Sequence, residues 1–330
     1  MMTLYKKHDD RLVVSGSEYN VVSENSPSQN ALTDALWIDL FNPTAEEKAR
    51  VEGLLGLSLP SSEDTQLLAP ADRSYQDGEC LVLTAAVLAR DEELYPYISD
   101  LTFLVSKTRL VTLRASEPLP ISRYATACAE RPHNLSDGHH VFLGLLSAFI
   151  NRLSEYVQAN GASMYEGSKR VFSDRSKNPI SSAEFQQTVA QIGRNSDVNA
   201  KARESLLNMG LLIDHVRNAW FGEEDIQRLL TDLRRDVNDI SAYADFVAAQ
   251  RAFLLSAVLG LLTLEQSRVT KILSIAATVF LPPTLIASIY GMNFKIMPEL
   301  SSPWGYPAAL ALMLLSAVVP YLFFRWKKWL

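Results

Sequence analysis

Cysteine is scarce in this chain of 330 residues, and the two that occur, Cys80 and Cys128, lie far apart and outside any CxxC pair. They supply neither a disulfide framework nor a thiolate metal site, so we expect two reduced core thiols. The N-terminus lacks the apolar run of a secretory signal, which favours a cytoplasmic body. No phosphate-binding glycine motif and no nucleophile–base or metal-ligand spacing is present, so an enzyme is not expected.

Charge is also scarce, and its distribution is uneven. Charged residues make up 21% of the chain and hydrophobic residues 48%, a combination that is unusual for a soluble domain. Residues 271–330 hold five basic residues and one acid, which gives +4 and leaves −10 for residues 1–270. The chain therefore consists of an acidic body and an apolar tail with a basic end, and we expect no nucleic acid among its partners.

Two uncharged runs in the tail are each long enough to cross a lipid bilayer. They comprise 23 residues at 272–294 and 25 at 300–324, whereas a spanning helix needs roughly 20. Arg325, Lys327 and Lys328 follow the second run, so the positive-inside rule places the C-terminus in the cytoplasm and the short loop outside. The alternative is a pair of buried helices in a soluble core. Aromatic residues at the ends of the runs favour the membrane: Tyr290, Trp304, Tyr306, Tyr321, Trp326 and Trp329.

The body has the pattern of an α+β domain that ends in helices. Thr44 and Glu47 have the spacing of a capping box and predict that a helix follows the strand predicted at 36–40. Residues 22–33, rich in Ser and Asn, are a weak linker candidate. The predicted strands are 36–40, 79–89, 97–106 and 109–113, and the predicted long helices are 137–173 and 181–222, separated at Asn178-Pro179.

A single helix is predicted to run from the body into the membrane. Between Glu223 and Tyr290 the only helix breakers are Gly260 and the pair Pro282-Pro283. A helix of that length measures on the order of 100 Å, and no monomer of this size buries it alone. Because two spanning helices do not enclose a polar path, transport requires several copies, and we predict a symmetric ring.

These patterns divide the chain into six parts. They are a cytoplasmic α+β and helical domain (1–222), a stalk helix (223–270), a first transmembrane helix (271–293), an external loop (294–302), a second transmembrane helix (303–325) and a basic cytoplasmic tail (326–330).

Small and hydroxylic side chains recur along one face of the first span. Such a stripe fits a water-filled pore around a shared axis, and it also fits close packing of membrane helices. The bulky Leu281 predicts an apolar constriction that gates by dewetting. The predicted lining comprises Thr270, Leu273, Ser274, Ala277, Leu281, Thr284 and Ser288.

A short motif closes the first span. Taken alone, Gly291 in Tyr290-Gly291-Met292-Asn293-Phe294 could be a helix C-cap and Asn293 a left-handed turn residue. The whole string, with Met297-Pro298-Glu299-Leu300 and the ending Lys327-Lys328-Trp329-Leu330, closely resembles the CorA family of divalent-cation transporters. The resemblance is strong over about 226–330 and weaker but colinear upstream.

The resemblance implies a funnel-shaped homopentamer in the inner or plasma membrane that carries Mg²⁺, with Co²⁺ and Ni²⁺ as lesser substrates. Mg²⁺ gives up its water reluctantly, so a ring of Asn293 amides, supported by Gly291 and Met292, would select the hydrated ion by hydrogen bonds. No organic cofactor is implied. Influx would be driven by the membrane potential, at about 4.6 kcal/mol for a divalent ion per 100 mV.

One residue departs from the family pattern. Position 295 is lysine where relatives often carry an acid, which leaves Glu299 as the only carboxylate of the loop. A ring of Lys295 would repel cations, so the zinc-transporting ZntB branch remains an alternative, although Met292 argues against it. An alternative of another class is a membrane-anchored signalling or scaffold protein, which has no use for Asn293.

Acidic residues of the body suggest a regulatory site. Glu63 and Asp64 resemble the acidic pair that in family members meets an aspartate of a neighbouring subunit's stalk helix, here Asp232. We hypothesise that Mg²⁺ bridges Asp64 and Asp232, so that the pore opens when internal Mg²⁺ falls. The alternative is that these are ordinary surface carboxylates. His139-His140 is interpreted as a local helix feature, because adjacent helical residues do not face each other.

Overall fold

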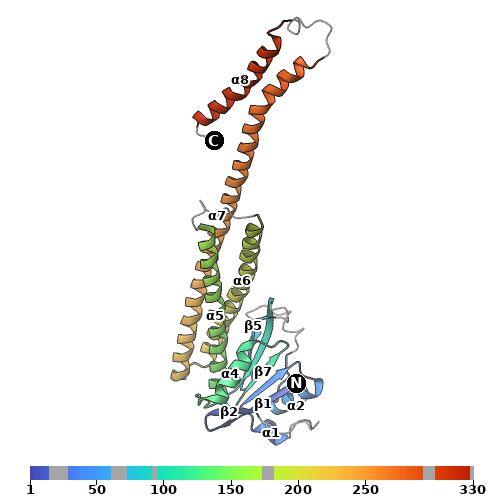
Figure 1. Cartoon of the computed structure of the whole chain (residues 1–330). Helices are drawn as coiled ribbons and strands as arrows, with labels where there is room; N and C mark the ends of the chain where they lie inside the picture. Colours follow the sequence, from blue (N-terminus) through green and yellow to red (C-terminus); the bar gives the residue numbers. More distant parts are fainter. Residues whose placement is uncertain (15–28, 61–72, 91–94, 173–181, 293–301, 328–330) are drawn as a thin grey trace. The chain divides into compact units, whose positions relative to one another are not determined.

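A computed structural model describes the chain except for residues 15–28, 61–72, 91–94, 173–181, 293–301 and 328–330. The chain divides into two compact units, Met1–Leu254 and Leu255–Leu330. Helix α7 (Glu224–Tyr290), an unbroken helix of 67 residues, belongs to the first unit in its early turns and to the second in its later turns (Figure 1). The predicted continuous helix over 223–290 is confirmed.

Within the described residues, seven strands form one mixed sheet in the order β2-β1-β3-β7-β6-β5-β4. Neighbouring strands are antiparallel, apart from β3 and β7, which run parallel with Asp39 opposite Thr112. The strands are β1 (Met2–His8), β2 (Arg11–Val14), β3 (Trp37–Phe41), β4 (Ser74–Asp77), β5 (Cys80–Arg90), β6 (Pro96–Val105) and β7 (Leu110–Arg114).

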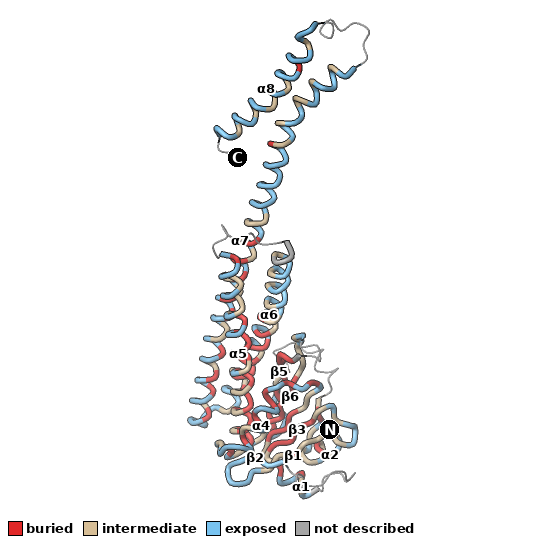
Figure 2. Tube along the Cα trace, viewed as in Figure 1, coloured by how far each residue is buried: buried red, intermediate tan, exposed pale blue. Residues whose placement is uncertain are grey.

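The sheet separates two hydrophobic layers, because alternate residues of each strand point to opposite faces. One layer packs α1 (Gln29–Thr33) and α2 (Ala45–Leu55) against Ile38, Val82 and Leu104. The other layer is larger and packs α4 (Leu119–Glu130), α5 (Gly138–Phe172) and α6 (Ser182–Ala219) against their neighbours on the strands, such as Phe103. Early turns of α7 complete this second layer, and Figure 2 shows the buried residues concentrated in it.

Local signals set the helix ends as expected. Thr44 Oγ1 accepts a hydrogen bond from the Glu47 backbone N–H at 3.2 Å, and Glu47 Oε2 accepts one from the Thr44 N–H at 2.9 Å, so the predicted capping box is confirmed. Gly56 ends α2 in the left-handed conformation with φ 70°, which glycine adopts without strain. Cys80 and Cys128 are buried free thiols, as predicted.

Two of our expectations for the body need revision. Strands β1, β2 and β4 were not predicted, because they are short or polar and do not show a clean alternation. The proposed linker 22–33 is wrong at its end, since Gln29–Thr33 is helix α1 and Leu32 is buried in the smaller core layer.

In the second unit, the later turns of α7 are followed by α8 (Gly305–Trp326). Both helices are long and apolar enough to cross a membrane, and only 6% of the most apolar stretch of each is buried. This exposure, visible as pale blue in Figure 2, argues against the alternative of two helices buried in a soluble core of this chain.

Candidate functional site

The predicted pore stripe lies on an exposed face of α7. The least exposed residues of this part of α7 include Ile275, which is 7% exposed, and the half-buried Val279, Pro282 and Ile286. At about 100° per residue, this face lies roughly 150° around the helix axis from the stripe. All seven predicted lining residues are exposed: Thr270, Leu273, Ser274, Ala277, Leu281, Thr284 and Ser288.

The threonines near and on this face have their hydroxyl hydrogens occupied by their own helix. Thr270 Oγ1 donates to the Gln266 carbonyl at 2.9 Å, and Thr278 Oγ1 donates to the Ser274 carbonyl at 2.8 Å. Thr284 Oγ1 lies 2.8 Å from the carbonyls of both Phe280 and Leu281. Each hydroxyl is therefore left with free oxygen lone pairs, which accept hydrogen bonds from water.

A groove of about 690 Å³ runs along α7 between Thr263 and Thr278. Its lining includes Thr270 and Ser274 of the stripe, and Phe324 of α8 contributes one apolar wall. Two residues of the stripe therefore border a space that is large enough for several water molecules.

Pro282 and Pro283 lie inside α7 without ending it. Proline has no N–H, so the carbonyls four residues earlier, at Thr278 and Val279, receive no hydrogen bond from these two positions. The middle of this candidate membrane span thus holds two backbone carbonyls that lack the usual helical donor four residues later.

Gly291, the first motif residue after α7, does not adopt the left-handed cap conformation that we considered for it. Glycines with positive φ in the described residues are at 56, 78 and 222. The Gly291 N–H instead continues the helical pattern with a 2.9 Å bond to the Ala287 carbonyl. A Cβ at position 291 would lie 3.2 Å from that oxygen, which is unusually close. Glycine therefore allows the tight final turn, and the exposed Met292 follows it.

Several predicted site residues lie outside the described residues. These are Asn293, Lys295 and Glu299 of the loop and Glu63 and Asp64 of the predicted regulatory pair. Their roles stay predictions.

Asp232, the third residue of the predicted regulatory Mg²⁺ site, is an exposed residue of α7. Asp236, one turn later, is also exposed, and neither carboxylate forms an ion pair with another described residue. Like charges four residues apart on a helix repel each other. In the described part of the chain no three His, Cys, Asp or Glu side chains gather to hold a metal ion, so a bridging cation would need ligands from elsewhere.

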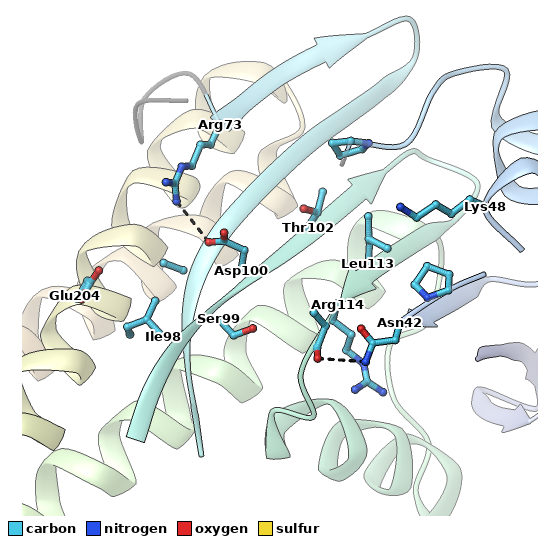
Figure 3. A pocket seen from close by; sticks show the side chains of 14 residues that line it. Asn42, Lys48, Arg73, Ile98, Ser99, Asp100, Thr102, Leu113, Arg114 and Glu204 are labelled. Atoms are coloured by element: carbon cyan, nitrogen blue, oxygen red, sulfur yellow. Dashed lines mark hydrogen bonds and ion pairs between the residues drawn. The ribbon is translucent and has the colours of Figure 1, made fainter. Parts of the chain in front are cut away.

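A polar cleft of about 570 Å³ opens at the carboxyl ends of β3 and β7 (Figure 3). The chain leaves β3 for α2 on one face of the sheet and leaves β7 for α4 on the other. Such a divergence between neighbouring parallel strands creates a crevice in α/β sheets. Arg73 Nη1 lies 3.5 Å from Asp100 Oδ1 in this cleft. The sequence alone did not predict the cleft.

Beside the cleft, an ion pair fastens β3 to β7. Arg114 Nη2 donates to Asp39 Oδ2 at 2.8 Å and Arg114 Nε lies 3.1 Å from both carboxylate oxygens. Thr112 Oγ1 donates to Asp39 Oδ1 at 2.7 Å and accepts from Trp37 Nε1 at 3.0 Å. Asp39 is 2% exposed. The buried charge is thus compensated on both oxygens, as such groups require.

His139 lies in a buried contact between α5 and the turn that precedes α7. Its ring stacks on Trp220 with centroids 3.9 Å apart, and its Nδ1 is 3.6 Å from Glu223 Oε2, too far for a hydrogen bond. Burial lowers the pKa of His139, against the raising effect of Asp137 and Glu223. His140 points elsewhere, to Asp137 at 2.7 Å, so the two histidines form separate local contacts.

Comparison with known proteins gives consistent matches along the chain. A family model described as CorA-like Mg²⁺ transporter protein matches residues 33–328. The chain is 30% identical over 331 residues to a protein of Pasteurella multocida named magnesium transport protein CorA, with full coverage of both chains. It is 31% identical over 312 residues to the protein of that name from Escherichia coli K12, covering 94% of this chain and 95% of the relative.

Solved structures share the fold. The complete structure of the CorA magnesium transporter from Methanocaldococcus jannaschii matches 100% of this chain and 99% of its own, with a TM-score of 0.75 at 16% identity. The cytoplasmic domain of ZntB from Vibrio parahaemolyticus covers 78% of this chain and 96% of its own, with a TM-score of 0.56 at 10% identity. An α/β domain, a long helix and two candidate membrane helices are common to the first of these structures and this chain.

Proposed function

Because the chain belongs to the family of CorA-like Mg²⁺ transporter proteins, we propose that it conducts Mg²⁺ across a membrane. The observation that carries this proposal is the exposed stripe on α7, which offers hydroxyl oxygens as acceptors. The water molecules around Mg²⁺ point their hydrogens outward, so a surface of acceptors suits a cation that keeps its hydration shell. A packing surface alone needs no such acceptors.

The path belongs to an assembly. Two spanning helices do not enclose a conduit, so several copies place their stripes around one axis, and the family resemblance favours five copies. Leu281 forms an apolar ring within this path, and Asn293 forms the selecting ring at its outer end. The chain lies in the inner or plasma membrane with both termini in the cytoplasm, and the potential drives Mg²⁺ inward, with Co²⁺ and Ni²⁺ as lesser substrates.

Flux into proteoliposomes tests this function. Purified protein is reconstituted, an interior-negative potential is set, and Mg²⁺ entry is followed with an internal dye while Co²⁺, Ni²⁺ or Zn²⁺ competes. We expect Mg²⁺ uptake that Asn293→Ala abolishes. Uptake that is unchanged in Asn293→Ala contradicts the selecting ring, and absence of any uptake supports a membrane-anchored scaffold. Preferred uptake of Zn²⁺ would favour the ZntB-type alternative, to which Lys295 points.

Internal Mg²⁺ regulates the conduit in this proposal. The ion bridges Asp64 of one subunit and Asp232 of the next and thereby offsets the repulsion between carboxylates, and its loss opens the pore. Support comes from the exposed position of Asp232 without an ion pair to the described residues, one turn from Asp236. Glu63 adds a further carboxylate beside Asp64.

The regulatory site is tested by measuring how internal Mg²⁺ inhibits flux. Asp232→Ala is expected to shift inhibition to higher internal Mg²⁺. The control is Asp245→Ala, which removes a carboxylate from the opposite face of α7, where Asp245 pairs with Arg203. An Asp232→Ala protein whose sensitivity matches that of the control would refute the assignment.

A further inference from the structure

Arg251 is a buried cation on α7. The residue is 4% exposed, and it forms no ion pair with any residue that the structure describes. Its Nη1 donates to the Asn195 carbonyl at 2.9 Å, whereas its Nη2 is fully buried and has no hydrogen-bond partner. Burial lowers the pKa of the guanidinium, but arginine stays protonated in proteins. A charge in this position requires compensation.

The guanidinium borders a small cavity between α5, α6 and α7. The cavity measures about 20 Å³, enough for one water molecule or one ion of similar size. Its described lining contains no Asp or Glu. Ser163 on α5 accepts hydrogen bonds from Asn195 Nδ2 at 2.8 Å and Gln191 Nε2 at 3.3 Å. The Ser163 hydroxyl therefore keeps its own hydrogen, and this hydroxyl and Arg251 Nη2 are the donors that remain available beside the cavity.

We propose that this cavity binds a single chloride ion, which neutralises Arg251 and joins α5, α6 and α7. Because no Asp or Glu lies in the described lining, a water molecule would fill the space without supplying a counter-charge from the part of the chain that the structure describes. Phosphate, sulfate and organic acids are too large for the cavity. A halide accepts several hydrogen bonds from any direction, which suits the free Nη2 of Arg251 and the Ser163 hydroxyl. The site is independent of the ion path, since its residues lie in the first unit.

Thermal unfolding of the full-length protein in detergent tests the site. Melting is compared in potassium chloride and potassium gluconate at equal ionic strength, because gluconate does not fit the cavity. Chloride at about ten times its dissociation constant should raise the melting temperature by roughly 3 to 5 °C in a saturable manner. Equal melting temperatures in the two salts would overturn the proposal.

Variants locate the effect. Arg251→Met should remove the chloride dependence, and Ser163→Ala should move its midpoint to a higher chloride concentration. Arg194→Met is the matched control, because Arg194 is an exposed arginine beside Asn195 on α6, and it should keep the wild-type dependence. A dependence that persists in Arg251→Met would refute the site.

Bromide diffraction decides the matter if Arg251→Met does not fold. Crystals of the wild-type protein soaked in bromide should give an anomalous peak within hydrogen-bond distance of Arg251 Nη2 and Ser163 Oγ. No anomalous signal at that position, with density for water in its place, would contradict chloride binding.

Discussion

Removing Arg114 should cost the cytoplasmic unit a large part of its stability. The Arg114 side chain is 11% exposed and that of Asp39 is 3% exposed, so Arg114→Met leaves a buried carboxylate whose remaining contact is Thr112. Breaking one partner of a buried ion pair typically costs about 3–5 kcal/mol. For a domain of this size, that corresponds to a fall in melting temperature of about 6 to 20 °C.

The assay is thermal unfolding of the full-length protein in detergent, followed by near-ultraviolet circular dichroism. The control is Arg123→Met, because Arg123 and Glu155 form an ion pair in which both side chains are about half exposed. Its loss should change stability by less than about 1 kcal/mol.

A double variant separates the charge from the contacts. Asp39→Asn keeps an acceptor for Thr112 but removes the negative charge, so Asp39→Asn combined with Arg114→Met should be more stable than Arg114→Met alone. The reasoning is refuted if Arg114→Met costs less than about 1 kcal/mol, or if the two changes are additive, since contacting charges couple.

Three further predictions follow from the same structure. Leu281→Ser should raise Mg²⁺ leak into proteoliposomes at high internal Mg²⁺ by wetting the apolar ring, whereas Ile289→Ser, off the stripe, should not; equal leak in both contradicts the pore face. The wild-type melting temperature should fall as the pH drops through about 6.5. Burial lowers the pKa of His139 in the folded protein, so at these pH values the unfolded chain binds a proton at this histidine more readily than the folded chain does. His139→Phe should therefore reduce the dependence of the melting temperature on pH. Thr44→Ala should cost about 1 kcal/mol in thermal unfolding through loss of the cap, and no loss would refute the role of the capping box.

The sequence predicted those parts of the fold whose signals are local and periodic. Long apolar runs identify α8 and the end of α7, and the Thr44–Glu47 spacing identifies the start of α2. Strand β4 escaped because its face is polar, although Asp77-Gly78 before β5 is a hairpin signal, and Gly78 indeed has φ 58°. Strand β1 contains Lys6 and Lys7, which obscure its alternation.

The candidate sites also differ in whether their residues lie close together in the sequence. The stripe on α7 follows from helical spacing within one segment, so the sequence revealed it. The sequence did not predict which residues far apart in the chain meet in the fold. Asp39 pairs with Arg114, and Arg251 and Ser163 line the same cavity. Each of these side chains is ordinary in its local sequence. What distinguishes it is the low dielectric environment that tertiary packing creates, and no periodicity encodes that environment.

The threonine hydroxyls of α7 that donate to their own backbone allow two properties of this helix to be changed separately: the shape of its packing surface and its supply of hydrogen-bond acceptors. Valine has nearly the shape of threonine, so Thr284→Val keeps the contour that neighbouring helices would recognise while it deletes an oxygen acceptor. On the proposed function, the methyl group of Thr284 would serve assembly and its hydroxyl oxygen would serve permeation. A lineage could silence conduction by exchanging one oxygen for a methyl group and still produce a fully assembled, inert complex.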